Sequence, residues 1–83
     1  MPHPRDAERI KVFARWYSWI GRDLAEAQRR TGIAARTLQR INAGKQPPPV
    51  AVLDRLARDA ADRGNAELAG ALAGAAIVEG SHA

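Results

Sequence analysis

Four glycines divide this 83-residue chain into segments whose apolar residues recur at every third or fourth position. That spacing is the period of an α-helix, and no alternating β-branched run or Asn-Gly or Asp-Gly hairpin turn interrupts it. The glycines and the run Pro47-Pro48-Pro49 stand between the segments, so the sequence predicts several short helices. The predicted fold class is therefore all-α, a compact domain of five helices.

Capping residues and helix breakers set the expected limits of each helix. Asp6 is placed to cap the first helix and Asn65 the fifth, while Pro49 suits the first turn of the fourth. The expected helices span about residues 6–20, 22–31, 34 or 35–43, 49–63 and 66–78. A disordered N-terminus is expected over residues 1–5, a C-terminal helical segment over 64–79 and a tail over 80–83.

Composition excludes several classes of function. The chain has no cysteine, which removes disulfides, thiolate zinc sites and cysteine nucleophiles. Its two histidines, His3 and His82, lie near the ends, which argues against a metal centre or a Ser-His-Asp hydrolase. The longest apolar stretch has about half the ~20 residues that span a bilayer, and no leader directs export. We therefore expect a cytoplasmic binding protein, not an enzyme, with no cofactor, no metal and no membrane.

Basic residues are concentrated in the first half of the chain. Residues 1–45 carry ten basic and four acidic side chains, whereas residues 46–83 carry three and five. A stretch without any acid contains five of the basic residues: Arg29, Arg30, Arg36, Arg40 and Lys45. Such a basic stripe is expected of a surface that binds a polyanion, although a solvated helix face gives the same count.

The second and third predicted helices are joined by a turn at Gly32. Two short helices cross steeply only if the turn has a left-handed residue, which favours glycine, and small side chains lie at the crossing. A gapless run then resembles the helix-turn-helix of the Cro and phage-repressor (XRE-like) family: Gly32, Ile33, Leu38, Ile41, Gly44 and Lys45. The resemblance covers about residues 6–63 and implies a lambda-repressor-like fold with its helix-turn-helix at about 22–43.

One position departs from the family pattern. The family usually has alanine four residues before the turn glycine, where this chain has Gln28, with Ala27 beside it. Either the helices cross slightly differently, or Ala27 takes over the role of the small residue.

The resemblance also implies that the third helix enters the major groove of DNA. Arginine can donate two hydrogen bonds to guanine, glutamine can bond both edge atoms of adenine, and alanine permits close approach. The expected base-reading residues are Ala35, Arg36, Gln39 and Arg40. The expected phosphate contacts are Arg22, Thr37, Asn42 and Lys45.

The function so implied is a sequence-specific, double-stranded DNA-binding transcriptional regulator. In this family such a protein is typically an operon autorepressor of phage or mobile-element type that binds an inverted repeat as a homodimer. The family includes regulators of anti-CRISPR and toxin–antitoxin operons, among which the sequence does not choose. Two alternatives stay open: an antitoxin or other protein-interaction module whose C-terminal helices bind a partner protein, and an RNA-binding helical module.

Small residues recur at intervals of four in the fifth predicted helix. This pattern permits close helix contact across a dimer, but an alanine-rich helix without any interface role shows it as well. The candidate dimer residues are Ala66, Gly70, Leu72, Gly74 and Ile77, with Leu68 and Val78 as further apolar area. The first helix is the rival interface if one of its two tryptophans is exposed.

Two further clusters have simpler interpretations. The aromatic residues of the first helix suit a base-stacking platform, but their helical spacing favours a core. The aspartates of the fourth helix alternate with arginines, which favours a solvated face over metal or acid–base chemistry. Pairs four residues apart are expected there between Asp54 and Arg58 and between Asp59 and Arg63.

Overall fold

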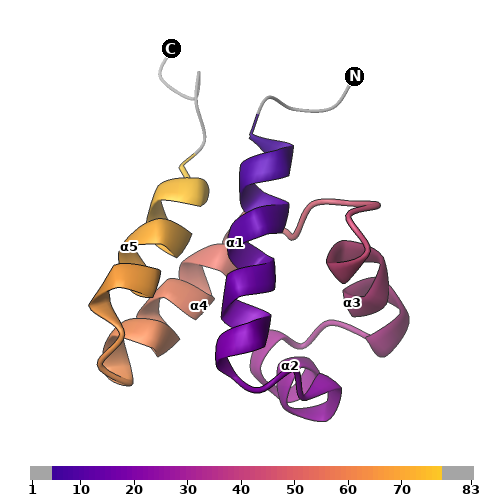
Figure 1. Ribbon diagram of the computed structural model, residues 1–83, viewed down its shortest axis with the longest axis horizontal. Coiled ribbons are helices and arrows are strands. Elements are labelled where there is room, and N and C mark those ends of the chain that lie inside the picture. The colour runs from indigo at the N-terminus through magenta and orange to yellow at the C-terminus, as the bar shows by residue number, and fades with distance from the viewer. Residues whose placement is uncertain (1–4, 78–83) are drawn as a thin grey trace.

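The computed structural model describes residues 5–77, and all regular structure in this range is α-helical. The five helices are α1 (Asp6–Trp19), α2 (Leu24–Thr31), α3 (Ala35–Asn42), α4 (Val50–Asp62) and α5 (Ala66–Ala75). In Figure 1, α1 stands in the middle, with α4 and α5 to one side and α2 and α3 to the other. The prediction of an all-α, five-helix fold is confirmed.

The core forms around α1, which contacts α3, α4 and α5. Phe13 and Trp16 have no exposed surface, and their ring centroids lie 5.6 Å apart. The other helices add mostly aliphatic side chains, among them Ala27, Leu38, Ile41, Leu53, Leu56, Ala60, Leu68 and Leu72. The interpretation of the aromatic residues as core is therefore confirmed for Phe13 and Trp16, which offer no surface on which a base could stack. It is wrong for Trp19, which is 38% exposed.

Side-chain caps explain where α2 and α5 begin. The Asp23 side chain accepts a hydrogen bond from the Glu26 backbone N–H at 3.1 Å, so α2 starts at Leu24, two residues later than predicted. At α5 the predicted cap is present, since the Asn65 side chain accepts from the Leu68 backbone N–H at 3.1 Å.

Two other helix starts differ slightly from the prediction. Arg5, not Asp6, is the N-cap residue of α1, and Pro49 is the N-cap of α4 where a first-turn residue was predicted. Arg5, which was predicted to precede the first helix, therefore stands at its N-terminus. The expectations for the remaining terminal segment, the tail, both histidines and Val78 concern residues 1–4 and 78–83, which lie outside the described range.

The end of α5 is held by arginines from the start of the chain. Arg9 is 7% exposed, and it donates from Nε to the Ala75 carbonyl at 2.8 Å and from Nη2 to the Ile77 carbonyl at 3.1 Å. Arg5 donates from Nη1 to the Gly74 carbonyl at 2.7 Å. The last carbonyls of a helix lack intrahelical donors, and here side chains supply them. The helix predicted to reach residue 78 ends at Ala75.

Candidate nucleic-acid interface

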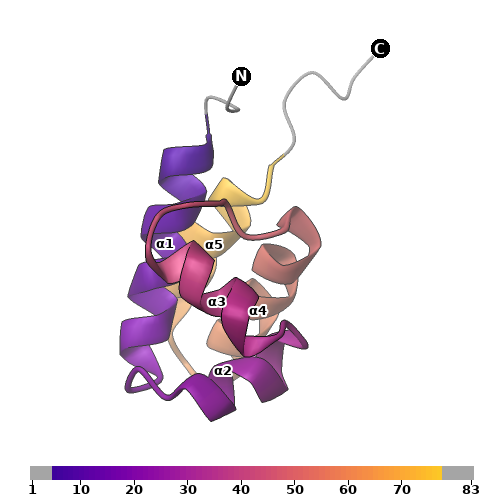
Figure 2. The same cartoon turned by 90° about the vertical axis from the view of Figure 1, so that its right-hand side faces the viewer.

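The two faces of α3 differ as the sequence predicts. Leu38 and Ile41 are fully buried, whereas Arg36, Gln39 and Arg40 are exposed. The exposed residues stand three and four positions apart, so they share one side of the helix. In Figure 2, α3 lies at the front of the molecule. Ala35, its first residue, is half-buried.

The turn between α2 and α3 is fixed by three short contacts. Gly32 has φ +73°, and its N–H donates to the Gln28 carbonyl at 2.8 Å. The Thr31 hydroxyl donates to the Ala27 carbonyl at 2.7 Å and accepts from the Ile33 N–H at 3.1 Å. Ala27 is fully buried and Gln28 is exposed. Ala27, and not Gln28, is therefore the small residue buried beside this turn.

Two arginines of the basic stripe form ion pairs, one of them buried more deeply than the other. Arg29 pairs with Glu26, and Arg30 pairs with Glu26 at 2.6 Å and with Asp59 at 2.9 Å. The Arg30 side chain, 14% exposed, is thereby less available to a polyanion, whereas the pair of the 74%-exposed Arg29 is weak. Within residues 5–77, three members of the stripe form no ion pair: Arg36, Arg40 and Lys45.

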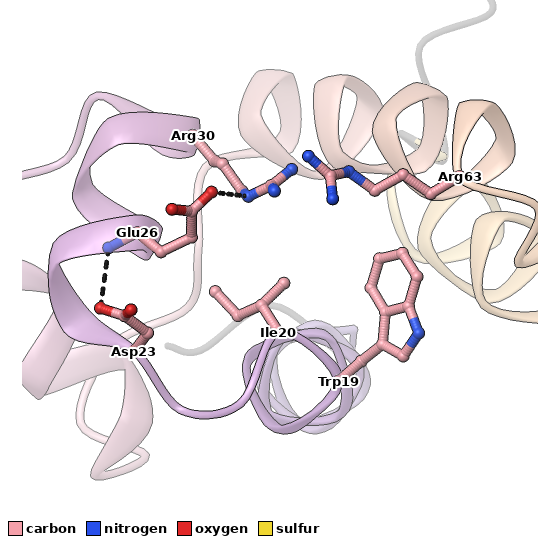
Figure 3. A pocket seen from close by; sticks show the side chains of 6 residues that line it. All are labelled: Trp19, Ile20, Asp23, Glu26, Arg30 and Arg63. Carbon is pink, nitrogen blue, oxygen red and sulfur yellow. Dashed lines mark hydrogen bonds and ion pairs between the residues drawn. The ribbon is translucent and has the colours of Figure 1, made fainter.

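Arg30 also joins α2 to α4. Its partner Asp59 accepts a second bond from Arg63 Nε at 3.2 Å, which is one of the two predicted pairs; the other, Asp54 with Arg58, measures 3.5 Å. A hollow of about 420 Å³ lies beside this network (Figure 3). Its lining contains two carboxylates, of Asp23 and Glu26, and two guanidiniums, of Arg30 and Arg63. The other lining residues are Trp19 and Ile20.

A second hollow, of about 290 Å³, lies between α1, the α1–α2 loop and the end of α3. It is lined by Ala14, Tyr17, Arg22 and Asn42. The structure thus brings together two of the four predicted phosphate contacts, Arg22 and Asn42. Tyr17, which the sequence assigned to the core, is half-buried: it packs against the core and also lines this hollow, a position that sequence reasoning did not predict. Its position between the core and exposed faces of α1, together with its hydroxyl group, was the available signal.

The other two predicted phosphate contacts are placed differently. Thr37 is half-buried within α3, and Lys45 is exposed just beyond it. The Lys45 backbone N–H donates to the Arg40 carbonyl at 2.9 Å, which keeps this lysine close to the end of α3.

The outer surface of α5 offers fewer apolar groups than predicted. Leu72 is fully buried and Leu68 is 3% exposed, so both belong to the core of this chain and cannot cover a partner. Leu72 is thereby removed from the candidate dimer residues. Ala66 and Gly70 are exposed and Gly74 is half-buried; a Cβ added at either glycine would meet no atom within 4 Å. Neither glycine is required by close packing inside this chain.

No family model matches the chain, and neither a curated protein nor a solved structure is significantly similar to it. Over residues 5–77, every helix is too short or too polar to cross a bilayer. In that same range, His, Cys, Asp and Glu do not gather in a group of three or more that could hold a metal ion. The case for a function therefore depends on α3 and the side chains around it.

Proposed function

We propose that this chain is a double-stranded DNA-binding transcriptional regulator of the Cro/phage-repressor type, with α2 and α3 as its helix-turn-helix. The observation that carries the proposal is the exposed face of α3, where Arg36 and Arg40 form no ion pair within residues 5–77. Leu38 and Ile41 hold the opposite face of the helix in the core. A helix presented in this way fits the width of a DNA major groove.

Each side chain on this face has a chemical role in the proposal. Arg36 and Arg40 donate to the O6 and N7 atoms of guanine, and Gln39 bonds the N6 and N7 atoms of adenine. Ala35 allows close approach to the groove floor. Lys45, beyond the end of α3, contacts a phosphate and adds affinity without sequence preference.

The proposed DNA-binding form is a homodimer on an inverted repeat. One helix covers only a few base pairs, which is too little for binding near ~10⁻⁸ M. A two-fold dimer presents two such helices about 34–36 Å apart, one turn of DNA. The dimer surface we propose is the outer side of α5, including Ala66, Gly70 and the 55%-exposed Ile77. The rival dimer surface is α1, where Trp19 is 38% exposed. In this proposal the protein acts in the cytoplasm as a repressor of its own operon, without cofactor or metal.

Selection of bound sequences from random duplex DNA tests the proposal, and the expected product is an inverted repeat. On that sequence, Arg36→Ala, Gln39→Ala and Arg40→Ala should each weaken binding by about 1–3 kcal/mol and relax the preference at one position. Arg58→Ala is the matched control, because it removes an arginine whose side chain is 81% exposed on α4. The proposal fails if the three α3 variants bind the selected duplex as tightly as this control does.

A second candidate function is a protein-interaction module such as an antitoxin. It is favoured by the two large hydrophobic residues exposed in the described range, Trp19 at 38% and Ile77 at 55%. Stable co-purification of a second protein that is released by Ile77→Asp or Trp19→Asp would support this alternative. Binding of duplex RNA in preference to duplex DNA at one salt concentration would instead identify an RNA-binding module.

A further inference from the structure

We infer that the hollow lined by Tyr17, Arg22 and Asn42 seats one backbone phosphate of the bound duplex. The inference rests on the proposed function for its ligand and adds a contact from α1, outside α2 and α3. Arg22 and Asn42 were already expected to contact phosphates; the hollow adds Tyr17, which lines it while also packing against the core.

The chemistry of the lining favours an anion. The hollow offers a guanidinium, a phenolic hydroxyl and a side-chain amide, each of which can donate a hydrogen bond to a phosphate oxygen. No carboxylate lines it, and Arg22 forms no ion pair within the described residues. The larger hollow at Trp19 differs, because Asp23 and Glu26 also line it and balance the charge of its two guanidiniums.

The backbone holds Arg22 at the edge of this hollow. Arg22 has φ +57°, the left-handed conformation that residues other than glycine seldom adopt. Its N–H donates to the Tyr17 carbonyl at 2.9 Å, so the residue that supplies the hydroxyl also fixes the backbone from which the guanidinium extends. The backbone of Arg22 is therefore held next to Tyr17 before any ligand arrives.

The hollow also lies where a phosphate is needed. Asn42 is the last residue of α3, and Gln39 stands one helical turn before it on the exposed surface. A helix lying in the major groove has a phosphate backbone along each side. A duplex read by Gln39 and Arg40 would bring one of these backbones past the end of α3, next to the hollow.

The test compares Tyr17→Phe and Arg22→Gln with the parent protein on a random-sequence DNA duplex, with affinity measured by fluorescence anisotropy over a range of salt concentrations. Arg22→Gln should lower the slope of log K against log salt by about 0.9, the value for one phosphate contact. Tyr17→Phe keeps the ring and removes no charge, so affinity should fall roughly 3- to 10-fold at an unchanged slope. Arg58→Gln is the control for loss of one surface arginine, and its slope should stay close to that of the parent.

The outcomes separate this inference from the proposed function. If the parent binds the duplex and the α3 variants weaken binding, but Tyr17→Phe matches the parent and Arg22→Gln matches Arg58→Gln, the phosphate seat is refuted and the function stands. If the parent does not bind duplex DNA at all, both are refuted. A second hollow variant, Asn42→Asp, places a carboxylate against the expected phosphate and should weaken binding at least 10-fold, with circular dichroism confirming that the fold is kept.

Discussion

Replacement of Arg9 by methionine tests how strongly the fold depends on the link between its first and last helices. The guanidinium of Arg9 bonds the carbonyls of Ala75 and Ile77, and the Ala75 bond is buried while the Ile77 bond is partly buried. Methionine keeps much of the apolar stem of arginine but provides no donor.

The expected loss follows from these two bonds. A buried carbonyl left without a donor costs about 1–3 kcal/mol, and the Ala75 carbonyl is in this position. The Ile77 carbonyl can bond water instead, and removal of a buried guanidinium returns part of its desolvation cost. We therefore expect a net loss of about 2 kcal/mol, from a total on the order of 4–12 kcal/mol for a domain of this length. This corresponds to a decrease in Tm of about 8–16 °C.

Thermal unfolding followed by circular dichroism measures the loss, and amide hydrogen exchange locates it. The Ala76 N–H donates to the Leu72 carbonyl at 3.1 Å. Relative to the parent protein, the exchange rate of this amide should increase more in the Arg9 variant than the rates of amides in α1. Arg15→Met is the control, because Arg15 lies 3.4 Å from Glu67 in an exposed pair that contributes less than about 1 kcal/mol. Equal Tm values for the Arg9 and Arg15 variants would refute the reasoning.

Three other substitutions test the structure. Leu38→Ala removes a fully buried side chain and should lower the free energy of unfolding, measured in urea, by about 2–5 kcal/mol. A loss below about 1 kcal/mol would mean that the face of α3 described as buried is assigned incorrectly. Gly32→Ala adds a Cβ that meets no atom within 4 Å, so only the left-handed backbone conformation disfavours the alanine. The free energy of unfolding should fall by about 1–2 kcal/mol, which a lower Tm would show. Arg30→Met breaks the ion pair with Asp59, in which the arginine side chain is 14% exposed. A double-mutant cycle with Asp59→Asn should give a coupling free energy of about 1–2 kcal/mol between the two residues. A coupling near zero would show that this ion pair does not hold α2 on α4.

The sequence predicted those features that depend on residues close to one another along the chain. Leu38 and Ile41 lie three positions apart on one side of a helix, so their burial follows from periodicity. The Asn65 cap depends on a backbone N–H three residues later, and it is present as predicted. Exposure of Arg36 and Arg40 follows from the same helical geometry. The helix ends were less accurate, because caps such as Asp23 compete with neighbouring residues for the same role.

Contacts between distant residues could not be predicted in this way. Arg9 and Ala75 are 66 positions apart, and Arg30 and Asp59 are 29 apart, so no local rule relates them. The hollow at Tyr17 likewise requires the end of α3 to lie against α1, which only the tertiary packing shows. Leu72 was assigned to a dimer surface as apolar area beside the small residues of its helix, and the packed structure places it inside.

This limit has a direct consequence for how charge is interpreted. The chain's excess of arginine suggests one continuous basic surface, yet the structure divides those arginines into groups with different partners. Arg9 bonds carbonyls at the end of α5, and Arg30 bonds carboxylates between α2 and α4, so both stabilise the fold. Arg36 and Arg40 form no ion pair within residues 5–77 and lie on the exposed face of α3. If the proposed function holds, cations already held by the fold release few counterions on DNA binding, so the salt dependence of binding should count the unpaired cations around α3, including Arg22 and Lys45, and not the total charge.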